Sequence, residues 1–157
     1  MKPNFKRMLD LVDEVFETRS DPDQLQVNQD VLKRLEEIHP ATLSELDEGE
    51  GPCVWILLIP TTAKVMEDFL SGKISEQEIL TNTFPAQSFE AIYLCSATTL
   101  PEYRGKGISK KLCVDAIKNI QTDHPVKTLY YWPFTTEGKK LAESVAKERG
   151  LVLVKKE

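Results

Sequence analysis

Apolar residues recur every three or four positions through much of the first forty residues, which is the spacing of an amphipathic helix. Two helices are predicted there, at residues 4–18 and 31–38. Turn signals follow each helix: residues 20–24 (SDPDQ) predict a cap or a turn, and residues 46–51 (LDEGEG) predict an acidic, flexible loop. Residues 1–52 are therefore expected to form a helical N-terminal part.

A different pattern begins after residue 52, where short continuous apolar runs alternate with helical spacing. The apolar runs are rich in strand-forming residues and predict strands at residues 53–59, 89–98, 126–132 and 151–156. The helical spacing between them predicts helices at residues 63–70, 76–81, 107–120 and 135–149. From residue 89 onward the order is strand, helix, strand, helix, strand, which is typical of a sheet with parallel pairs. The predicted fold class is α/β (α+β), a mixed sheet flanked by helices.

Length and composition indicate one domain over residues 1–157, because 41% hydrophobic residues are enough for one core. No apolar run is long enough to span a membrane, and no signal-peptide pattern follows the first residues. The three cysteines lie far apart in apolar surroundings, so neither a disulfide framework nor a metal site is expected. His39 and His124 each precede a proline and are interpreted as turn residues rather than ligands. A cytoplasmic protein without a metal is expected.

The net charge of −5 is unevenly distributed along the chain. Residues 1–52 hold 6 basic and 13 acidic residues (−7), residues 53–100 hold 2 and 5 (−3), and residues 101–157 hold 12 and 7 (+5). The basic residues of the last part are interleaved with acidic ones and form no aromatic-rich stripe. A small phosphorylated ligand therefore fits this part better than a nucleic acid.

The basic part begins with the sequence LPEYRGKGISKKL, residues 100–112, between a predicted strand and a predicted helix. A helix that follows a strand presents unpaired backbone N–H groups and attracts anions. Gly105 and Gly107 give a phosphate access to that backbone, and Arg104 and the neighbouring lysines add positive charge. The spacing matches neither a Walker A loop nor a dinucleotide-binding fingerprint. A strand-loop-helix site for another phosphate-bearing ligand is predicted.

The sequence PEYRGKGIS resembles the pyrophosphate loop of the GNAT (Gcn5-related N-acetyltransferase) superfamily, in which the pattern RxxGxG/A is read here as Arg104, Gly107 and Ser109. The resemblance is strong over residues 88–122 and extends in element order over 88–157, the expected acyl-CoA-binding core. It implies that acetyl-CoA, or another acyl-CoA, is the co-substrate. The residues implied to hold its pyrophosphate through backbone N–H groups are Arg104, Gly105, Lys106, Gly107, Ile108 and Ser109. The backbone of Ala97, Thr98 and Thr99 is implied to bind the pantetheine arm, and the next strand to splay away.

Catalysis by such a protein needs a base for the amine and an acid for the departing thiolate. Glu90, near the start of the central strand, is the candidate base. The family usually places its acid, a tyrosine, on the last helix, where this chain has Ala146. Tyr130, Tyr131 and Tyr103 are the alternatives for the acid.

The resemblance implies an N-acyltransferase that transfers an acyl group directly to an unidentified amine. The acidic N-terminal third favours a cationic acceptor, small molecule or peptide. The alternative is a CoA-binding or regulatory module with the same fold and little catalysis, because the usual acid is missing and helical residues 63–82 interrupt the usual strand meander. A third hypothesis is an interaction protein that presents its acidic N-terminal helices to a basic partner. The oligomeric state stays open, with a dimer among the options.

Overall fold

The computed structural model describes residues 3–19, 29–133 and 135–156, and leaves the predicted cap at residues 20–24 outside the described residues. Its elements in chain order are α1 (Pro3–Arg19), α2 (Gln29–Ile38), β1 (Leu43–Asp47), β2 (Pro52–Thr61), α3 (Ala63–Leu70), α4 (Glu76–Thr81), β3 (Ala91–Thr99), η1 (Pro101–Tyr103), α5 (Ile108–Asp123), β4 (Thr128–Tyr131), α6 (Thr136–Arg149) and β5 (Val152–Lys155). Every helix and strand predicted from the sequence is present within a few residues.

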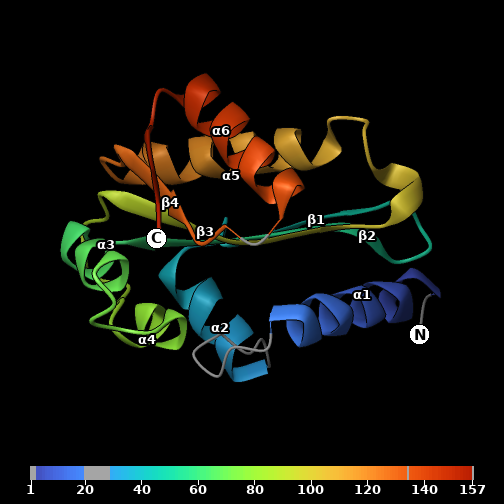
Figure 1. Cartoon of the computed structure of the whole chain (residues 1–157), viewed down its shortest axis with the longest axis horizontal. Coiled ribbons are helices and arrows are strands. Elements are labelled where there is room, and N and C mark those ends of the chain that lie inside the picture. Colours follow the sequence, from blue (N-terminus) through green and yellow to red (C-terminus); the bar gives the residue numbers. More distant parts are fainter. Residues whose placement is uncertain (1–2, 20–28, 134, 157) are drawn as a thin grey trace.

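The five strands form one mixed sheet in the order β1-β2-β3-β4-β5. β1, β2 and β3 pair antiparallel, whereas β3, β4 and β5 pair parallel through the connecting helices α5 and α6. The helices cover both faces: α5 and α6 lie on one side of the sheet, and α1 to α4 lie on the other (Figure 1). The predicted α+β class is confirmed, and the architecture is compatible with a GNAT-like fold.

The N-terminal part differs from its prediction, because residues 43–47 form strand β1 and do not belong to a purely helical segment. The run LSELD alternates between exposed and half-buried positions and pairs antiparallel with β2. As the edge strand it packs on one neighbour only, so it needs no continuous apolar run. The loop predicted at residues 46–51 is confined to the turn between Asp47 and Pro52.

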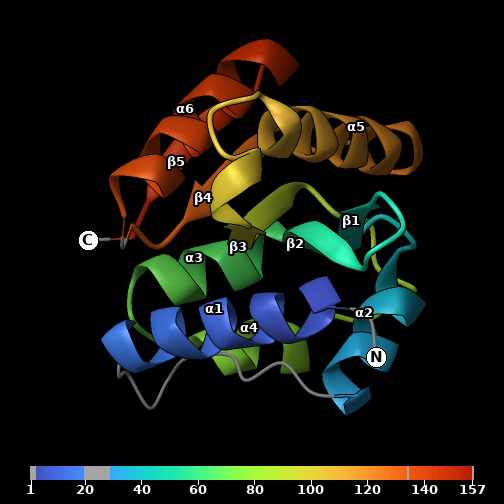
Figure 2. The ribbon, with the colours of Figure 1, turned by 90° about the vertical axis from the view of Figure 1, so that its right-hand side faces the viewer.

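The alternation of side chains along β3 and β4 builds one core on each face of the sheet. Ile92, Leu94, Leu129 and Tyr131 belong to the cluster that includes the buried faces of α5 and α6. Tyr93 and Tyr130 belong to the cluster that includes Phe69 of α3 and the buried residues of α4. Figure 2 shows α5 and α6 packed side by side above the strands, with α1 running below them. Helices therefore cover both faces of the sheet, with one hydrophobic cluster on each face.

Two irregularities of β3 affect the site. The register with β2 shifts between Leu57, which pairs with Ser96, and Leu58, which pairs with Leu94, so that Cys95 is the extra residue of a β-bulge. The ladder between β3 and β4 ends at the pair Leu94 and Tyr131, although β3 continues to Thr99. Residues 95–99 therefore extend beyond the paired part of β4.

Candidate functional site

The predicted strand-loop-helix arrangement is present at the C-terminal end of β3. Leu100 is buried, and its N–H donates to the Cys53 carbonyl over 2.9 Å, which holds the end of β3 against the start of β2. The short 3-10 helix η1 then leads to two glycines in the left-handed region, Gly105 at φ 76° and Gly107 at φ 75°. A Cβ atom added at either glycine would meet nothing within 4 Å. The glycines are therefore required by the backbone conformation, and the space beside them is open.

The first turn of α5 begins without a side-chain cap. Gly107 is its N-cap residue and has no side chain to accept a hydrogen bond. The first bond into the helix runs from the Lys111 N–H to the Gly107 carbonyl, over 3.1 Å. The N–H groups that precede Lys111 in this turn have no acceptor within an α-helix. They are available to a ligand at the positive end of the helix dipole.

Three hydrogen bonds hold the loop between β3 and α5. The hydroxyl groups of Thr99 and Ser109 lie 2.6 Å apart and join the end of the strand to the start of the helix. Arg104 donates from Nε to the Thr99 carbonyl over 3.1 Å and from its backbone N–H to the Pro101 carbonyl over 3.2 Å. Of the six N–H groups predicted to face a pyrophosphate, the one of Arg104 is thus already engaged in the η1 turn.

Several side chains at the loop meet an opposite charge or a ring. Arg7 of α1 binds Glu102 through two N–H···O bonds of 2.7 Å each. Its guanidinium lowers the pKa of the Glu102 carboxyl to about 2, so this carboxylate stays ionised and paired. Lys106 Nζ lies 5.6 Å from the centre of the Tyr103 ring, and Lys110 Nζ lies 3.5 Å from Glu148 of α6. The loop therefore keeps a positive character, because its one carboxylate is neutralised by α1.

The residues predicted to hold a pantetheine arm, Ala97, Thr98 and Thr99, lie in the part of β3 beyond the β4 ladder. They pair with Ile56, Trp55 and Val54 of β2. Their other strand edge has no partner in β4, because β4 and its ladder with β3 both end at Tyr131. The binding of a pantetheine arm at this edge, and the implied splaying of the next strand, stay predictions.

The predicted base and the loop lie at opposite ends of β3. Glu90 is exposed and directly precedes β3, whose nine residues at about 3.3 Å each put it about 30 Å from Thr99. Its backbone is engaged on both sides, with its N–H on Thr61 and its carbonyl accepting from Lys127. The structure does not bring Glu90 to the loop.

The two strand tyrosines are buried on opposite faces of the sheet. Tyr130 is 0% exposed, its hydroxyl lies 3.0 Å from the Thr61 hydroxyl, and burial raises its pKa. Tyr131 is also buried, within the α5 and α6 cluster, and burial likewise raises its pKa. Both tyrosines therefore keep their protons at neutral pH, and neither is brought to the loop.

Tyr103 is the tyrosine nearest the loop in sequence. Its hydroxyl donates to Glu48 over 3.1 Å, and this hydrogen bond raises its pKa. The phenol is thus directed toward the turn between β1 and β2.

A buried carboxylate that the sequence did not single out lies on the other face of the sheet. Glu76, at the start of α4, is 1% exposed and accepts a hydrogen bond of 2.5 Å from the Tyr93 hydroxyl. In the sequence it resembled an ordinary first-turn acid, beside the capping box of Ser75 and Glu78 that the structure confirms. Its burial depends on Tyr93, 17 positions away, and no local signal could have indicated it.

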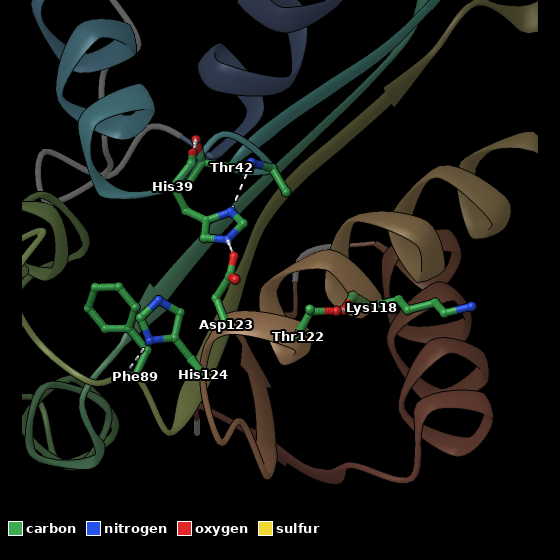
Figure 3. A network of polar contacts seen from close by, with 8 residues as sticks. His39, Thr42, Phe89, Lys118, Thr122, Asp123 and His124 are labelled. Atoms are coloured by element: carbon green, nitrogen blue, oxygen red, sulfur yellow. Dashed lines mark hydrogen bonds and ion pairs between the residues drawn. The ribbon is translucent and has the colours of Figure 1, made fainter.

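A groove of about 550 Å³ with a mixed polar and apolar lining lies between the turn after α2, the start of β1 and α5. There His39 is buried, accepts from the Ala41 N–H at Nδ1 over 3.0 Å, and lies 2.7 Å from Asp123 through Nε2 (Figure 3). Because Nδ1 is an acceptor, the Nε2 proton is donated to Asp123. Both ring nitrogens are engaged, so this pair fastens the turn after α2 to the end of α5. His124, the C-cap of α5, accepts from the Phe89 N–H over 3.3 Å.

Among the described residues, no cluster of three or more His, Cys, Asp or Glu side chains could hold a metal ion. Within the same part of the chain, the helices are too short or too polar to cross a bilayer.

Comparison with known proteins adds no relative: the sequence matches no protein-family model and no curated protein. The likeness to the GNAT superfamily thus rests on the loop sequence and on the order of the elements.

Proposed function

We propose that this protein is an acyl-CoA-dependent N-acyltransferase, with acetyl-CoA as the co-substrate and an amine as the acceptor. The observation that carries the proposal is the uncapped start of α5, with two left-handed glycines before it and lysines around it. A pyrophosphate would satisfy N–H groups that the chain leaves without a helical acceptor and would offset the local positive charge.

The binding residues divide into three groups by what each can offer. The N–H groups from Gly105 to Ser109 are the donors for the pyrophosphate oxygens, and the open space beside both glycines supports that role. Lys106 and Lys111 add charge next to those donors. Arg104 is a positioning residue, because its guanidinium ties the loop to Thr99. The edge of residues 97–99 is the site for the pantetheine amides, since β4 leaves it uncovered.

The chemistry is direct transfer of the acyl group from the thioester to the amine. The acyl-CoA supplies an activated carbonyl carbon, so the chain has to hold the two reactants together and manage two protons. The roles of Glu90, Tyr103, Tyr130 and Tyr131 in proton transfer stay predictions. Because Tyr130 and Tyr131 are both buried, the structure gives no support for either of them as the acid.

Thermal unfolding with and without acetyl-CoA tests the proposal. At a ligand concentration of 100 times Kd, binding to the folded state stabilises it by about 2.7 kcal/mol. Arg104→Ala should reduce this stabilisation, because the loop loses its bond to Thr99. No change of melting temperature with any CoA species at millimolar concentration would refute acyl-CoA binding.

The alternative, a CoA-binding module with little catalysis, is favoured by one specific observation. Ala146, at the position where the GNAT family usually carries its tyrosine, is buried, so no acid side chain enters from this point of α6. Release of CoA thiol in the presence of a panel of amines separates the two functions. Stabilisation by acetyl-CoA without thiol release for any amine would favour the module.

A cytoplasmic location belongs to this proposal. Cys53, Cys95 and Cys113 are thiols rather than disulfides. Burial raises the pKa of Cys53, and that of Cys113 to about 12, so these two thiols stay protonated. Cysteines that form no disulfide agree with a reducing compartment, in which acyl-CoA is also found.

A further inference from the structure

A second cavity, of about 320 Å³, lies on the face of the sheet opposite α5 and α6. Its wall comes from the connection between α3 and α4 and from the ends of β4 and β5. The lining residues that matter here are Phe69, Lys73, Glu76, Glu78, Trp132 and Lys156. The volume lies at the lower end of the range of small-molecule sites.

The cavity lies beside the end of the ladder between β3 and β4. Trp132 directly follows Tyr131, the last residue of β4 that pairs with β3, and its ring centre lies 5.9 Å from that of Phe69. Cys95, the bulged residue of β3, packs against the same cluster. Four residues of strand, about 13 Å, connect Thr99 at the loop to Cys95. An extended ligand anchored at the loop can therefore run along residues 95–99, beyond the end of β4, toward this cavity.

Glu76 is the one fully buried carboxylate of the lining. Tyr93 donates to its Oε2 over 2.5 Å, which fixes the orientation of the carboxylate. Tyr93 itself is buried between Phe69 and Tyr130, with ring centres 5.1 Å from each. A carboxylate that is buried and held in one orientation binds an ammonium group strongly and can accept a proton from it.

The charges around the cavity are balanced. The lining combines two aromatic rings with two lysines, Lys73 and Lys156, and two carboxylates, Glu76 and Glu78. Lys156 Nζ lies 5.0 Å from the ring centre of Phe69 and 5.8 Å from that of Trp132, and it donates to the Phe69 carbonyl over 3.1 Å. Two cations and two carboxylates suit a small ligand that carries one charge of each sign. A polyamine fits less well, because the two lysines would repel it.

We propose that this cavity is the acceptor site, that its acceptor is an amine bearing a carboxylate, of the amino-acid class, and that Glu76 is the base. The inference rests on the proposed acyl-CoA-dependent transfer. The acceptor ammonium first loses one proton to solvent, and the neutral amine then attacks the thioester carbonyl. The C–N bond forms, the C–S bond breaks with its electron pair on sulfur, Glu76 takes the second amine proton, and that proton then passes to the thiolate. The products are an amide and CoA thiol. Tyr93 is a positioning residue, because it acts through Glu76.

The decisive experiment measures thiol release from acetyl-CoA by wild type and Glu76→Gln, with acetyl-CoA affinity determined for both proteins. The acceptors are glycine and L-alanine, each beside its carboxamide, together with spermidine. Glu76→Gln should lower kcat/KM for the amino acids about 100-fold or more, with acetyl-CoA affinity unchanged. Glu137→Gln, an exposed acid in the first turn of α6, is the matched control and should retain full activity.

Two further variants keep the proposal testable if Glu76→Gln does not fold. Lys73→Met, at an exposed position, should raise KM for the amino acids about tenfold and leave KM for their carboxamides unchanged. Tyr93→Phe removes the donor that orients the Glu76 carboxylate, so kcat for the amino acids should fall while their KM and the acetyl-CoA affinity stay unchanged.

The outcomes separate this inference from the proposed function. Without acetyl-CoA binding in the wild type, the transferase and the acceptor site both fail. With binding and thiol release in the wild type, equal activity of Glu76→Gln, or a preference for spermidine over every amino acid, overturns the acceptor site alone. Equal effects of Lys73→Met on acids and carboxamides overturn the assignment of a carboxylate-bearing acceptor.

Discussion

The helices α5 and α6 follow neighbouring parallel strands and pack side by side, but their first turns are built in opposite ways. Thr135 caps α6 from extended backbone, and its hydroxyl accepts from the Gly138 N–H over 2.9 Å. Gly107 starts α5 from the left-handed region with no side chain to do the same. One helix satisfies its first turn internally, whereas the other leaves it exposed.

The two helices also differ in how their charged residues relate to the helix dipole. α6 has an acid, Glu137, in its first turn and bases, Lys147 and Arg149, in its last, which complements the helix dipole. α5 has neither: its first turn contains Lys110 and Lys111 and no acid, and its last residue is Asp123. The ends of α5 rely on partners from other segments, with His39 at Asp123 and Glu148 near Lys110. Positive charge at an uncapped N-terminus lowers stability unless an anion binds there, and this supports a ligand site at α5 and none at α6.

The largest effect is expected from Gly107→Glu, which would place a Cβ and a carboxylate at the open turn. Acetyl-CoA affinity should fall at least about 100-fold, or about 2.8 kcal/mol, as measured by calorimetry. The matched control is Gly150→Glu, at the left-handed C-cap of α6 with φ 68°. Both changes strain a left-handed backbone by about 1 to 2 kcal/mol, but the control should leave acetyl-CoA affinity unaltered. Equal affinity losses in the two variants would contradict the difference between the helices.

Lys111→Glu should move stability and binding in opposite directions. A carboxylate in the first turn of α5 complements the dipole and should raise the free energy of unfolding by about 0.5 kcal/mol. Acetyl-CoA affinity should fall about tenfold, because a cation near the pyrophosphate becomes an anion. Lys147→Glu in the last turn of α6 is the reverse case and should lower stability with no change in affinity. Denaturant unfolding and calorimetry on each variant measure both quantities, and a parallel change in Lys111→Glu would rule out the charge argument.

Thr135→Ala removes the cap that makes α6 independent of a ligand. The free energy of unfolding should decrease by about 1 kcal/mol, and acetyl-CoA affinity should stay as in the wild type. Urea unfolding with and without acetyl-CoA measures both effects, and a lowered affinity would show that α6 contributes to the site.

The smallest effect concerns the C-terminal ends of the two helices, where Gly150 is the C-cap of α6 and His124 is the C-cap of α5. Burial lowers the pKa of His124 below its ordinary value of 6.5, so the unfolded chain binds more protons below that pH. The stability contributed by neutral His124 is complete above pH 6.5 and is lost as the pH falls through 6.5 toward the folded pKa. His124→Asn should flatten the decrease of melting temperature between pH 7 and pH 5. An unchanged slope would assign this pH dependence to other groups.

The sequence predicted the fold well because the elements from β2 to β5 carry strong local patterns. It missed β1, since five residues alternating at a sheet edge give a weak signal and their pairing with β2 is decided by tertiary structure. The loop at residues 104–109 was predictable because its glycines and lysines are contiguous.

The chemistry beyond the loop was not predictable, because it depends on which face of a strand each side chain occupies and on partners distant in sequence. The pairs of Glu76 with Tyr93 and of Arg7 with Glu102 join residues 17 and 95 positions apart. Local spacing also could not reveal that the buried hydroxyl of Tyr130 is hydrogen-bonded to the hydroxyl of Thr61.

The early end of the ladder between β3 and β4 makes part of the central strand sensitive to deuterium exchange. Along residues 96–99, alternate backbone amides point toward β2 or toward the edge beyond the end of β4. The first set should exchange slowly, as in any paired strand, and the second rapidly, although both belong to the same short segment in the middle of the sheet. Protection of the second set alone, on addition of acetyl-CoA, would report occupancy of the site amide by amide.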